Sequence, residues 1–159
     1  MNSSAAILIT ALMGATTDCP KPETSVKYDR IYCQKQDVAV VQQGERFGMI
    51  NLQGELIIPV EYEDFDLMDN GNFIAKKNGK FGIIDRKNTI IAPFVYDSIS
   101  AKVGKNINFA VMVKDNKAGI SNTLTGDVVL SHEYDDIFPH NTQQIIYLIQ
   151  KQSNKNRFC

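Results

Sequence analysis

The stretch that decides the fold is residues 72–96, which read N-F-I-A-K-K-N-G-K-F-G-I-I-D-R-K-N-T-I-I-A-P-F-V-Y. Its central pentapeptide, F-G-I-I-D at 81–85, recurs as F-G-M-I-N 34 residues earlier and, more weakly, as A-G-I-S-N 37 residues later. A period between about 20 and 50 residues is typical of arrays whose small units share one continuous core. The positions that we expect to build this lattice are Phe47, Gly48, Tyr62, Phe81, Gly82, Tyr96, Gly119 and Tyr134.

A tight hairpin turn is predicted just before the pentapeptide in every copy. Asn78-Gly79 is the strongest short-range hairpin signal, because both central residues of a type I′ turn need a positive φ. We place the same turn at Gln43-Gly44 in the first copy and at Asp115-Asn116 in the third, where asparagine tolerates the left-handed conformation. The chain should therefore fold back antiparallel at each of these points.

A second turn follows the pentapeptide, at 51–54, 85–88 and 122–126. Each of these segments begins with Asn or Asp, whose side chain can bond the turn backbone, and ends with Gly or Asn, which tolerates a positive φ. A third strand comes next. Pro59 and Pro93 are expected to end its pairing, because proline lacks the N–H group that a ladder needs.

The apolar residues alternate with a period of two rather than 3.6, so we expect no long amphipathic helix in residues 26–159. Gly48, Gly82 and Gly119 recur at one lattice position, and we interpret them as points where a neighbouring unit approaches closely. The extra residues of the third copy, 101–108, are expected to form a surface loop, where an insertion is tolerated.

These patterns predict an all-β protein, made of tandem antiparallel β-meander repeats of 34–38 residues. The repeats cover about 38–65, 72–99 and 109–137, with partial units at both ends of a repeat domain at 28–159. A linker at 18–27 precedes the domain. We favour an open arc, with a small propeller-like closure as the alternative, because closed propellers typically need at least four blades.

The repeat pattern, G-[RK]-F-G-x-I-[ND]-x-x-G followed by [LI]-I-x-P and Y-[DE], resembles the WG-repeat (KWG-type) family of bacterial proteins. Residues 28–137 carry the resemblance. Phe47 and Phe81 stand where that family has tryptophan, and Ala118 replaces the aromatic residue altogether. The resemblance implies a β-repeat fold, no shared catalytic motif and a general role in interaction.

Four pairs of a tyrosine and an acidic residue recur with the lattice. They could serve as binding handles for a protein or a glycan. We favour an architectural role, with the ring in the seam between units and the carboxylate bonded to a turn amide, because a residue that repeats with the lattice is first explained by the lattice. The pairs are Tyr28/Asp29, Tyr62/Glu63, Tyr96/Asp97 and Tyr134/Asp135.

One cluster, residues 132–136 together with His140, contains residue types that carry chemistry. Successive residues of a strand point to opposite faces, so His132, Tyr134 and Asp136 share one face and leave too few convergent ligands for a divalent metal. A hydrolytic site around His132 has no supporting nucleophile motif. We therefore predict no catalytic residue, no metal site and no cofactor.

Composition restricts the partners. The net charge of −1 and the pI of about 6.1 supply no broad attraction for nucleic acid or anionic lipid. The apolar run at 5–15 is too short to span a bilayer and has the length of a signal-peptide core, although no Lys or Arg precedes it. We expect residues 1–17 to be a signal peptide and the protein to be periplasmic or secreted; the alternative is a cytoplasmic protein that retains the run.

The three cysteines show neither C-x-x-C spacing nor a histidine at zinc-ligand distance. In an exported chain Cys19 and Cys33 could form a disulfide, worth about 3 kcal/mol in the chain-entropy model. In a reducing compartment both stay free thiols. Cys159 is left over in either case.

We expect a non-enzymatic interaction module in an exported bacterial protein, with a protein partner whose identity the sequence does not reveal. The first alternative is a cytosolic inhibitor or immunity-type protein that neutralises one partner. The second is a degenerate hydrolase built around His132 and Asp136.

Overall fold

The computed structural model describes residues 22, 24–33, 38–100, 108–141 and 146–150; the side chains of Cys33, 138–141 and 146–150 are not described. The predicted signal peptide, the Cys19–Cys33 pair, the loop at 101–107 and the side chain of His140 therefore lie outside the description. In the described ranges all regular elements are strands, fourteen in number, which confirms the all-β prediction. None of these residues belongs to a helix long and apolar enough to cross a membrane.

The strands form three antiparallel four-stranded sheets and one two-stranded sheet, in each of which they follow chain order. The first sheet holds β1 (Arg30–Cys33), β2 (Val38–Gln43), β3 (Arg46–Asn51) and β4 (Leu56–Tyr62). The second holds β5 (Asp64–Leu67), β6 (Phe73–Lys77), β7 (Lys80–Ile84) and β8 (Ile90–Tyr96). The third holds β9 (Ser98–Ser100), β10 (Phe109–Lys114), β11 (Lys117–Asn122) and β12 (Val128–Tyr134). The last holds β13 (Asp136–Asn141) and β14 (Ile146–Gln150).

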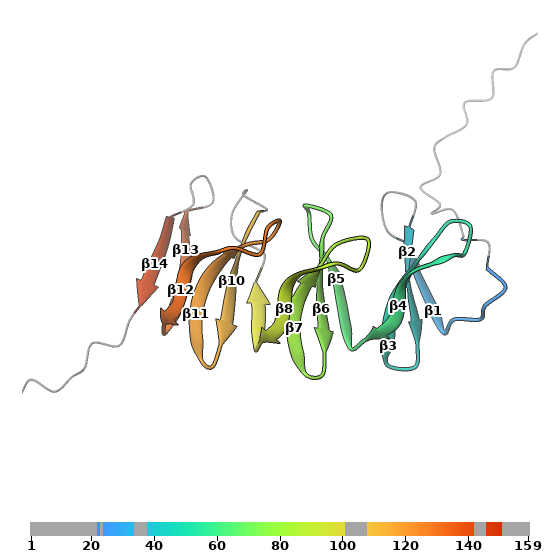
Figure 1. The fold of residues 1–159 in the computed structure, drawn as a ribbon, viewed down its shortest axis with the longest axis horizontal. Coiled ribbons are helices and arrows are strands. Elements are labelled where there is room, and N and C mark those ends of the chain that lie inside the picture. The colour runs from blue at the N-terminus through green and yellow to red at the C-terminus, as the bar shows by residue number, and fades with distance from the viewer. Residues whose placement is uncertain (1–21, 23, 34–37, 101–107, 142–145, 151–159) are drawn as a thin grey trace, which may run out of the picture.

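The sheets follow one another along the long axis of the molecule, from the first sheet at one end to the two-stranded sheet at the other (Figure 1). This arrangement is the open array that we expected, and it is not a closed ring. At the carboxyl end, the described residues after the third sheet form a sheet of two strands. At the amino end, the residues of the expected partial unit supply β1 of the first full sheet.

The structural unit is out of phase with the sequence repeat. Each tyrosine-acid pair marks the boundary, since Tyr62 ends β4 and β5 begins two residues later in the next sheet. The backbone N–H of Glu63 already donates to the carbonyl of Lys76 in that next sheet, at 2.8 Å, and the N–H of Asp97 donates to Val113 in the same way. The last strand of one copy therefore leads directly into the first strand of the following sheet.

The predicted hairpin turns are confirmed in two copies and corrected in one. Asn78 and Gly79 have φ of 53° and 76°, and Asp115 and Asn116 have φ of 52° and 60°, as a type I′ turn requires. In the first copy Gln43 pairs with Arg46 across the hairpin, so the turn is 44–45 rather than Gln43-Gly44. Gly44 there takes a φ of 59° at the first central position, as in a type II′ turn.

The second turn forms as expected. Oδ1 of Asp85 accepts the N–H groups of Lys87 and Thr89, both at 2.8 Å, and Asn88 closes the turn with a φ of 65°. Gly54 and Gly126, which end the corresponding turns, also have positive φ, of 81° and 80°. The polar first residue and the permissive last residue are thus the local cause of each reversal.

Two expectations, one about the prolines and one about the recurring glycines, are corrected. Pro59 and Pro93 lie inside β4 and β8 instead of ending them, at irregularities of the pairing where proline is tolerated. The glycines of β3 and β7 are approached closely, but by the fourth strand of their own sheet, β4 or β8. A Cβ on Gly48 would lie 2.6 Å from the carbonyl oxygen of Ile58, and one on Gly82 would lie 2.8 Å from that of Ala92.

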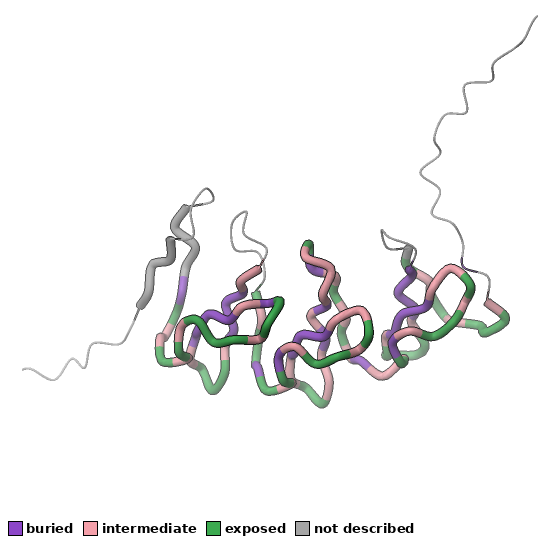
Figure 2. The backbone as a smooth tube through the Cα atoms, turned by 45° about the horizontal axis from the view of Figure 1, so that its top comes forward, coloured by how far each residue is buried: buried purple, intermediate pink, exposed green. Residues whose placement is uncertain are grey.

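Every hydrophobic cluster except one spans two neighbouring sheets, and we call each such cluster a seam. Alternate residues of a strand point to opposite faces, so one strand can serve the seam before its sheet and the seam after it. Ile84 packs towards the first sheet and Ile83 towards the third. The buried residues accordingly run through the strands, while the turns are exposed (Figure 2).

Candidate functional site

Three of the four repeated tyrosines, Tyr62, Tyr96 and Tyr134, lie in the seams as predicted, whereas Tyr28 packs in the cluster confined to the first sheet. Tyr62, in β4 of the first sheet, is buried with Phe73 of the second sheet, and its ring stacks on Phe94 at a centroid distance of 5.8 Å. Its hydroxyl donates to Oδ1 of Asn88 in the second sheet, at 2.6 Å. Burial raises the pKa of Tyr62. Tyr96 occupies the next seam in the same manner.

Two of the acidic residues that follow the tyrosines, Glu63 and Asp97, each join two hairpins. Glu63 accepts the N–H of Gly79, in the hairpin turn of the following sheet, at 3.0 Å, and its other oxygen pairs with Arg46 of its own sheet at 3.1 Å. Asp97 does the same with the N–H of Asp115, at 2.9 Å, and with the ammonium group of Lys80. We call these two acids the staples. The predicted bond from carboxylate to turn amide is confirmed for both.

The same bonds set the acidity of the staples. The N–H of Gly79 is the main cause that lowers the pKa of Glu63, and Arg46 adds to it. Lys80 is the main cause that lowers the pKa of Asp97, and the N–H of Asp115 contributes. Asp97 in turn raises the pKa of Lys80. Both carboxylates are therefore held in the charged form that links neighbouring sheets.

The staples predict acid sensitivity. A carboxylate whose pKa is lower in the folded chain stabilises it fully above the unfolded pKa, of about 4, and loses this effect as the pH falls through the folded value. The midpoint temperature of thermal unfolding should therefore decrease as the pH is lowered from about 5 to about 2, because the two carboxylates become protonated over this range. Circular dichroism melts of the protein and of a Glu63→Gln/Asp97→Asn double variant measure it.

The double variant should melt at a lower temperature at neutral pH and should lose less on acidification, because its neutral side chains do not titrate. An identical pH dependence in the two proteins would show that other carboxylates cause the acid sensitivity.

His132 has a packing role in the lattice. It lies 38 residues after Phe94, and its ring contacts Tyr96 at a centroid distance of 5.4 Å, much as Phe94 contacts Tyr62. Burial lowers its pKa, and Lys114 adds to the effect. Asp136 uses its Oδ1 to accept the N–H of Ile137, at 2.8 Å. The imidazole therefore takes the place of a phenyl ring, which suffices to explain a histidine at this position.

Among the described residues, no group of three or more His, Cys, Asp or Glu side chains is arranged to hold a metal ion. A shallow hollow of about 330 Å³ lies between the β5–β6 loop and the β7–β8 turn. Asp85, on its wall, is engaged by the turn: partial burial alone would raise its pKa, but the N–H groups of Thr89 and Lys87 outweigh this and lower it. The hollow is lined by Asp69, Asn70, Gly71, Asn72, Asp85, Arg86 and Lys87.

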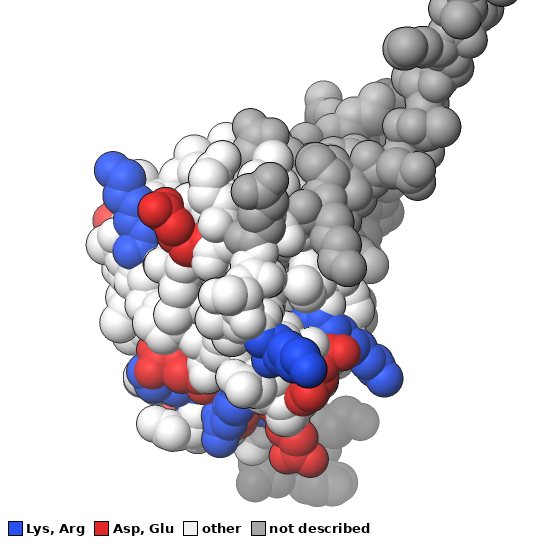
Figure 3. All heavy atoms as spheres, turned by 90° about the vertical axis from the view of Figure 1, so that its right-hand side faces the viewer, with Lys and Arg blue, Asp and Glu red and all other residues white. Residues whose placement is uncertain are grey.

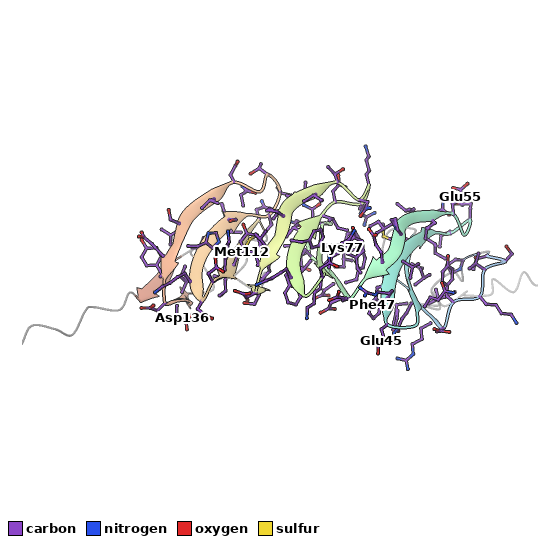
Figure 4. The ribbon with its side chains drawn as sticks, turned by 60° about the horizontal axis from the view of Figure 1, so that its bottom comes forward. Glu45, Phe47, Glu55, Lys77, Met112 and Asp136 are labelled. Carbon is purple, nitrogen blue, oxygen red and sulfur yellow. The ribbon has the colours of Figure 1, made fainter. Side chains whose placement is uncertain are left out.

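One set of side chains repeats with the lattice without entering a seam. The fourth strand of each full sheet begins with an aliphatic residue, and these residues are exposed to nearly the same extent: Leu56 54%, Ile90 58% and Val128 55%. We call them the aliphatic row. Glu55, the neighbour of Leu56, lies at the outer tip of the β3–β4 turn, at the opposite end of the sheet from Glu45 (Figure 4).

The sequence analysis did not single out the aliphatic row. The signal was present, because each member follows closely on the second turn of its copy, but the pattern only placed these residues in a strand. At the end of the array formed by the first sheet, acidic and basic side chains are interspersed among uncharged ones, so this face carries no patch of a single charge (Figure 3).

The stacked four-stranded sheets, the seams and the staples define an all-β repeat protein with one sheet per repeat. A family model described as a WG containing repeat matches the chain twice, at residues 47–81 and 81–117. Residues 47–117 are therefore similar to two WG repeats, in agreement with the sequence resemblance. No curated protein and no solved structure shows significant similarity to the chain.

Proposed function

We propose that this protein is a non-enzymatic repeat module that binds another protein. The observation that carries the proposal is the aliphatic row, one exposed side chain per full sheet at equivalent positions. The seams do not use these residues, since Leu56, Ile90 and Val128 belong to none of the hydrophobic clusters. Apolar side chains left at a regular spacing suit a partner that contacts several repeats at once.

The electrostatics of the chain favour a protein over a polyanion as the partner. The net charge is −1, and Lys77, next to β4, is paired with Glu61 at 3.0 Å. The proposal includes export, which is supported by the apolar run at 5–15. The absence of a shared catalytic motif in the family that the repeat resembles supports a non-enzymatic role.

Acidic substitutions in the aliphatic row are expected to weaken partner binding. Leu56→Glu and Ile90→Glu should each weaken binding about tenfold or more, because each places a charge in an apolar contact, and should change the free energy of unfolding by no more than about 0.5 kcal/mol. The measurement is capture of partners from an extract of the source cells, followed by titration of the identified partner in purified form.

Val95→Glu is the matched control. Val95 is an exposed residue of β8, outside the aliphatic row, and the equivalent positions in β4 and β12 are Glu61 and Glu133, so the lattice accepts an acid there. The Val95→Glu protein should bind like the unaltered chain. Equal binding by Leu56→Glu, Ile90→Glu and Val95→Glu would reject the aliphatic row as the contact surface.

A further inference from the structure

The fourth strand of the third sheet differs from its two counterparts. β4 and β8 each contain a proline, Pro59 and Pro93, and the equivalent residue of β12 is Ser131. All three strands are the last of their sheets, so among the described residues each has one edge without a neighbour in the sheet. Proline on an edge strand removes an N–H group and discourages the addition of a further strand. β12 lacks this protection.

β12 also leaves more apolar surface uncovered. Val129 is 59% exposed, whereas Ile57 and Ile91, its equivalents in β4 and β8, are partly buried. Leu130 is likewise partly buried where Ile58 is completely buried. The unprotected edge therefore coincides with the most exposed apolar side chain of the three fourth strands, Val129.

The charges along β12 distinguish two occupants of this edge, a second copy of the chain and a strand of another protein. The strand is bordered by Asp127, which is exposed, and contains Glu133 near its other end, also exposed. A second copy that paired antiparallel about Ser131 would set Asp127 opposite Asp135 of the other copy, which is already paired with Lys117, so the two copies would offer each other no complementary charge there. A strand with basic residues at its ends meets the same edge with opposite charge.

We propose that β12 is a strand-addition site for a segment of the partner protein. The segment is extended, carries aliphatic side chains at alternate positions and has Lys or Arg at its ends. Main-chain hydrogen bonds supply affinity in this mode of recognition, and alternate side chains supply specificity. The inference rests on the proposed protein-binding function and names the chemistry of the partner.

The test uses the full chain and a blocked synthetic peptide, Lys-Val-Thr-Val-Thr-Val-Lys, whose length matches the seven residues of β12. Its binding is titrated by isothermal calorimetry, and amide hydrogen exchange locates the contact. We expect binding with slowed exchange at 128–133. A peptide with Glu at both ends should bind about tenfold more weakly, and a peptide methylated on alternate backbone nitrogens should not bind, since it cannot extend the ladder.

Ser131→Pro is the decisive variant, because the same residue stands at this position in the two other sheets and the lattice accepts it. It should weaken peptide binding about tenfold or more, through the lost N–H group and the ring of proline. Ser131→Ala keeps the N–H group and should bind like the unaltered chain. An unchanged melting temperature in both variants shows that the fold is intact.

Absence of peptide binding to the unaltered chain would overturn the inference, as would equal binding by Ser131→Pro or by the methylated peptide. These results are independent of the proposed function, which is decided by capture of a partner through the aliphatic row. If a partner is captured only when Leu56 and Ile90 are intact, but the peptide does not bind, then the protein-binding function stands and strand addition at β12 is rejected.

Discussion

Replacing Phe73 by alanine is expected to lower the free energy of unfolding by about 3–5 kcal/mol, the usual cost of emptying a buried phenyl site. Phe73 begins β6, is completely buried and stacks on Phe65 at a centroid distance of 4.6 Å. It packs in the seam with Met49 and Tyr62 of the preceding sheet, so the cavity would loosen the contact between two sheets. Urea unfolding followed by circular dichroism measures the change.

A second substitution should restore part of this loss. The residues equivalent to Phe73 and Ala75 are Ala110 and Met112 in the third sheet, where the small and the large side chain have exchanged places. Ala75→Met alone should overfill the seam and cost about 1–3 kcal/mol. Combined with Phe73→Ala it reproduces the pair of the third sheet.

The double variant should be more stable than the sum of the two single effects predicts, by about 1 kcal/mol or more, because the added side chain fills the cavity left by the removed one. Strictly additive effects would mean that the two positions do not share a cavity. A loss of less than about 1 kcal/mol for Phe73→Ala would show that the seam does not depend on the phenyl ring.

This exchange of sizes also shows what the sequence leaves undetermined. The turns could be predicted, because Asn78-Gly79 and the Asx residues act through local backbone preferences. The total volume of a seam is shared by residues of two sheets, and neither Phe73 nor Met112 is recognisable as a partner of a small neighbour until the strands are aligned.

Two of the corrected interpretations, those of Gly48 and of the first hairpin turn, have a common cause, because both depend on how the strands pair. A glycine such as Gly48 indicates that something approaches closely, but not which strand does so; the answer depends on the irregular pairing at Pro59, which brings β4 across β3. In the first hairpin, glycine can take either central position of a tight turn, so only the pairing of Gln43 with Arg46 places the turn at 44–45.

The role of the staples could be predicted from the sequence, whereas the exposure of the aliphatic row could not. Glu63 repeats with the lattice and bonds a neighbouring turn, so periodicity alone indicated its role. Leu56 repeats just as regularly, yet it is exposed. Periodicity therefore indicates that a residue occupies the same environment in each unit, whereas the array itself decides whether that environment is a seam or solvent.

Gly126→Ala is expected to destabilise the protein by about 3–5 kcal/mol, the sum of a left-handed backbone cost and an overpacking cost. Gly126 has a φ of 80°, and a Cβ at this position would lie 2.1 Å from the carbonyl oxygen of Ile91 in the second sheet. The turn that ends the β11–β12 connection would therefore have to move away from β8. Loss of stability is measured by urea unfolding.

Gly79→Ala separates the two costs. Gly79 has a φ of 76°, almost that of Gly126, but a Cβ there meets no atom within 4 Å. It should cost only the backbone part, about 1–2 kcal/mol. The difference between the variants then measures how rigidly the third sheet is held against the second. Equal losses would mean that the β11–β12 turn yields without cost, and that the seam and the Asp97 staple fix the spacing of these two sheets.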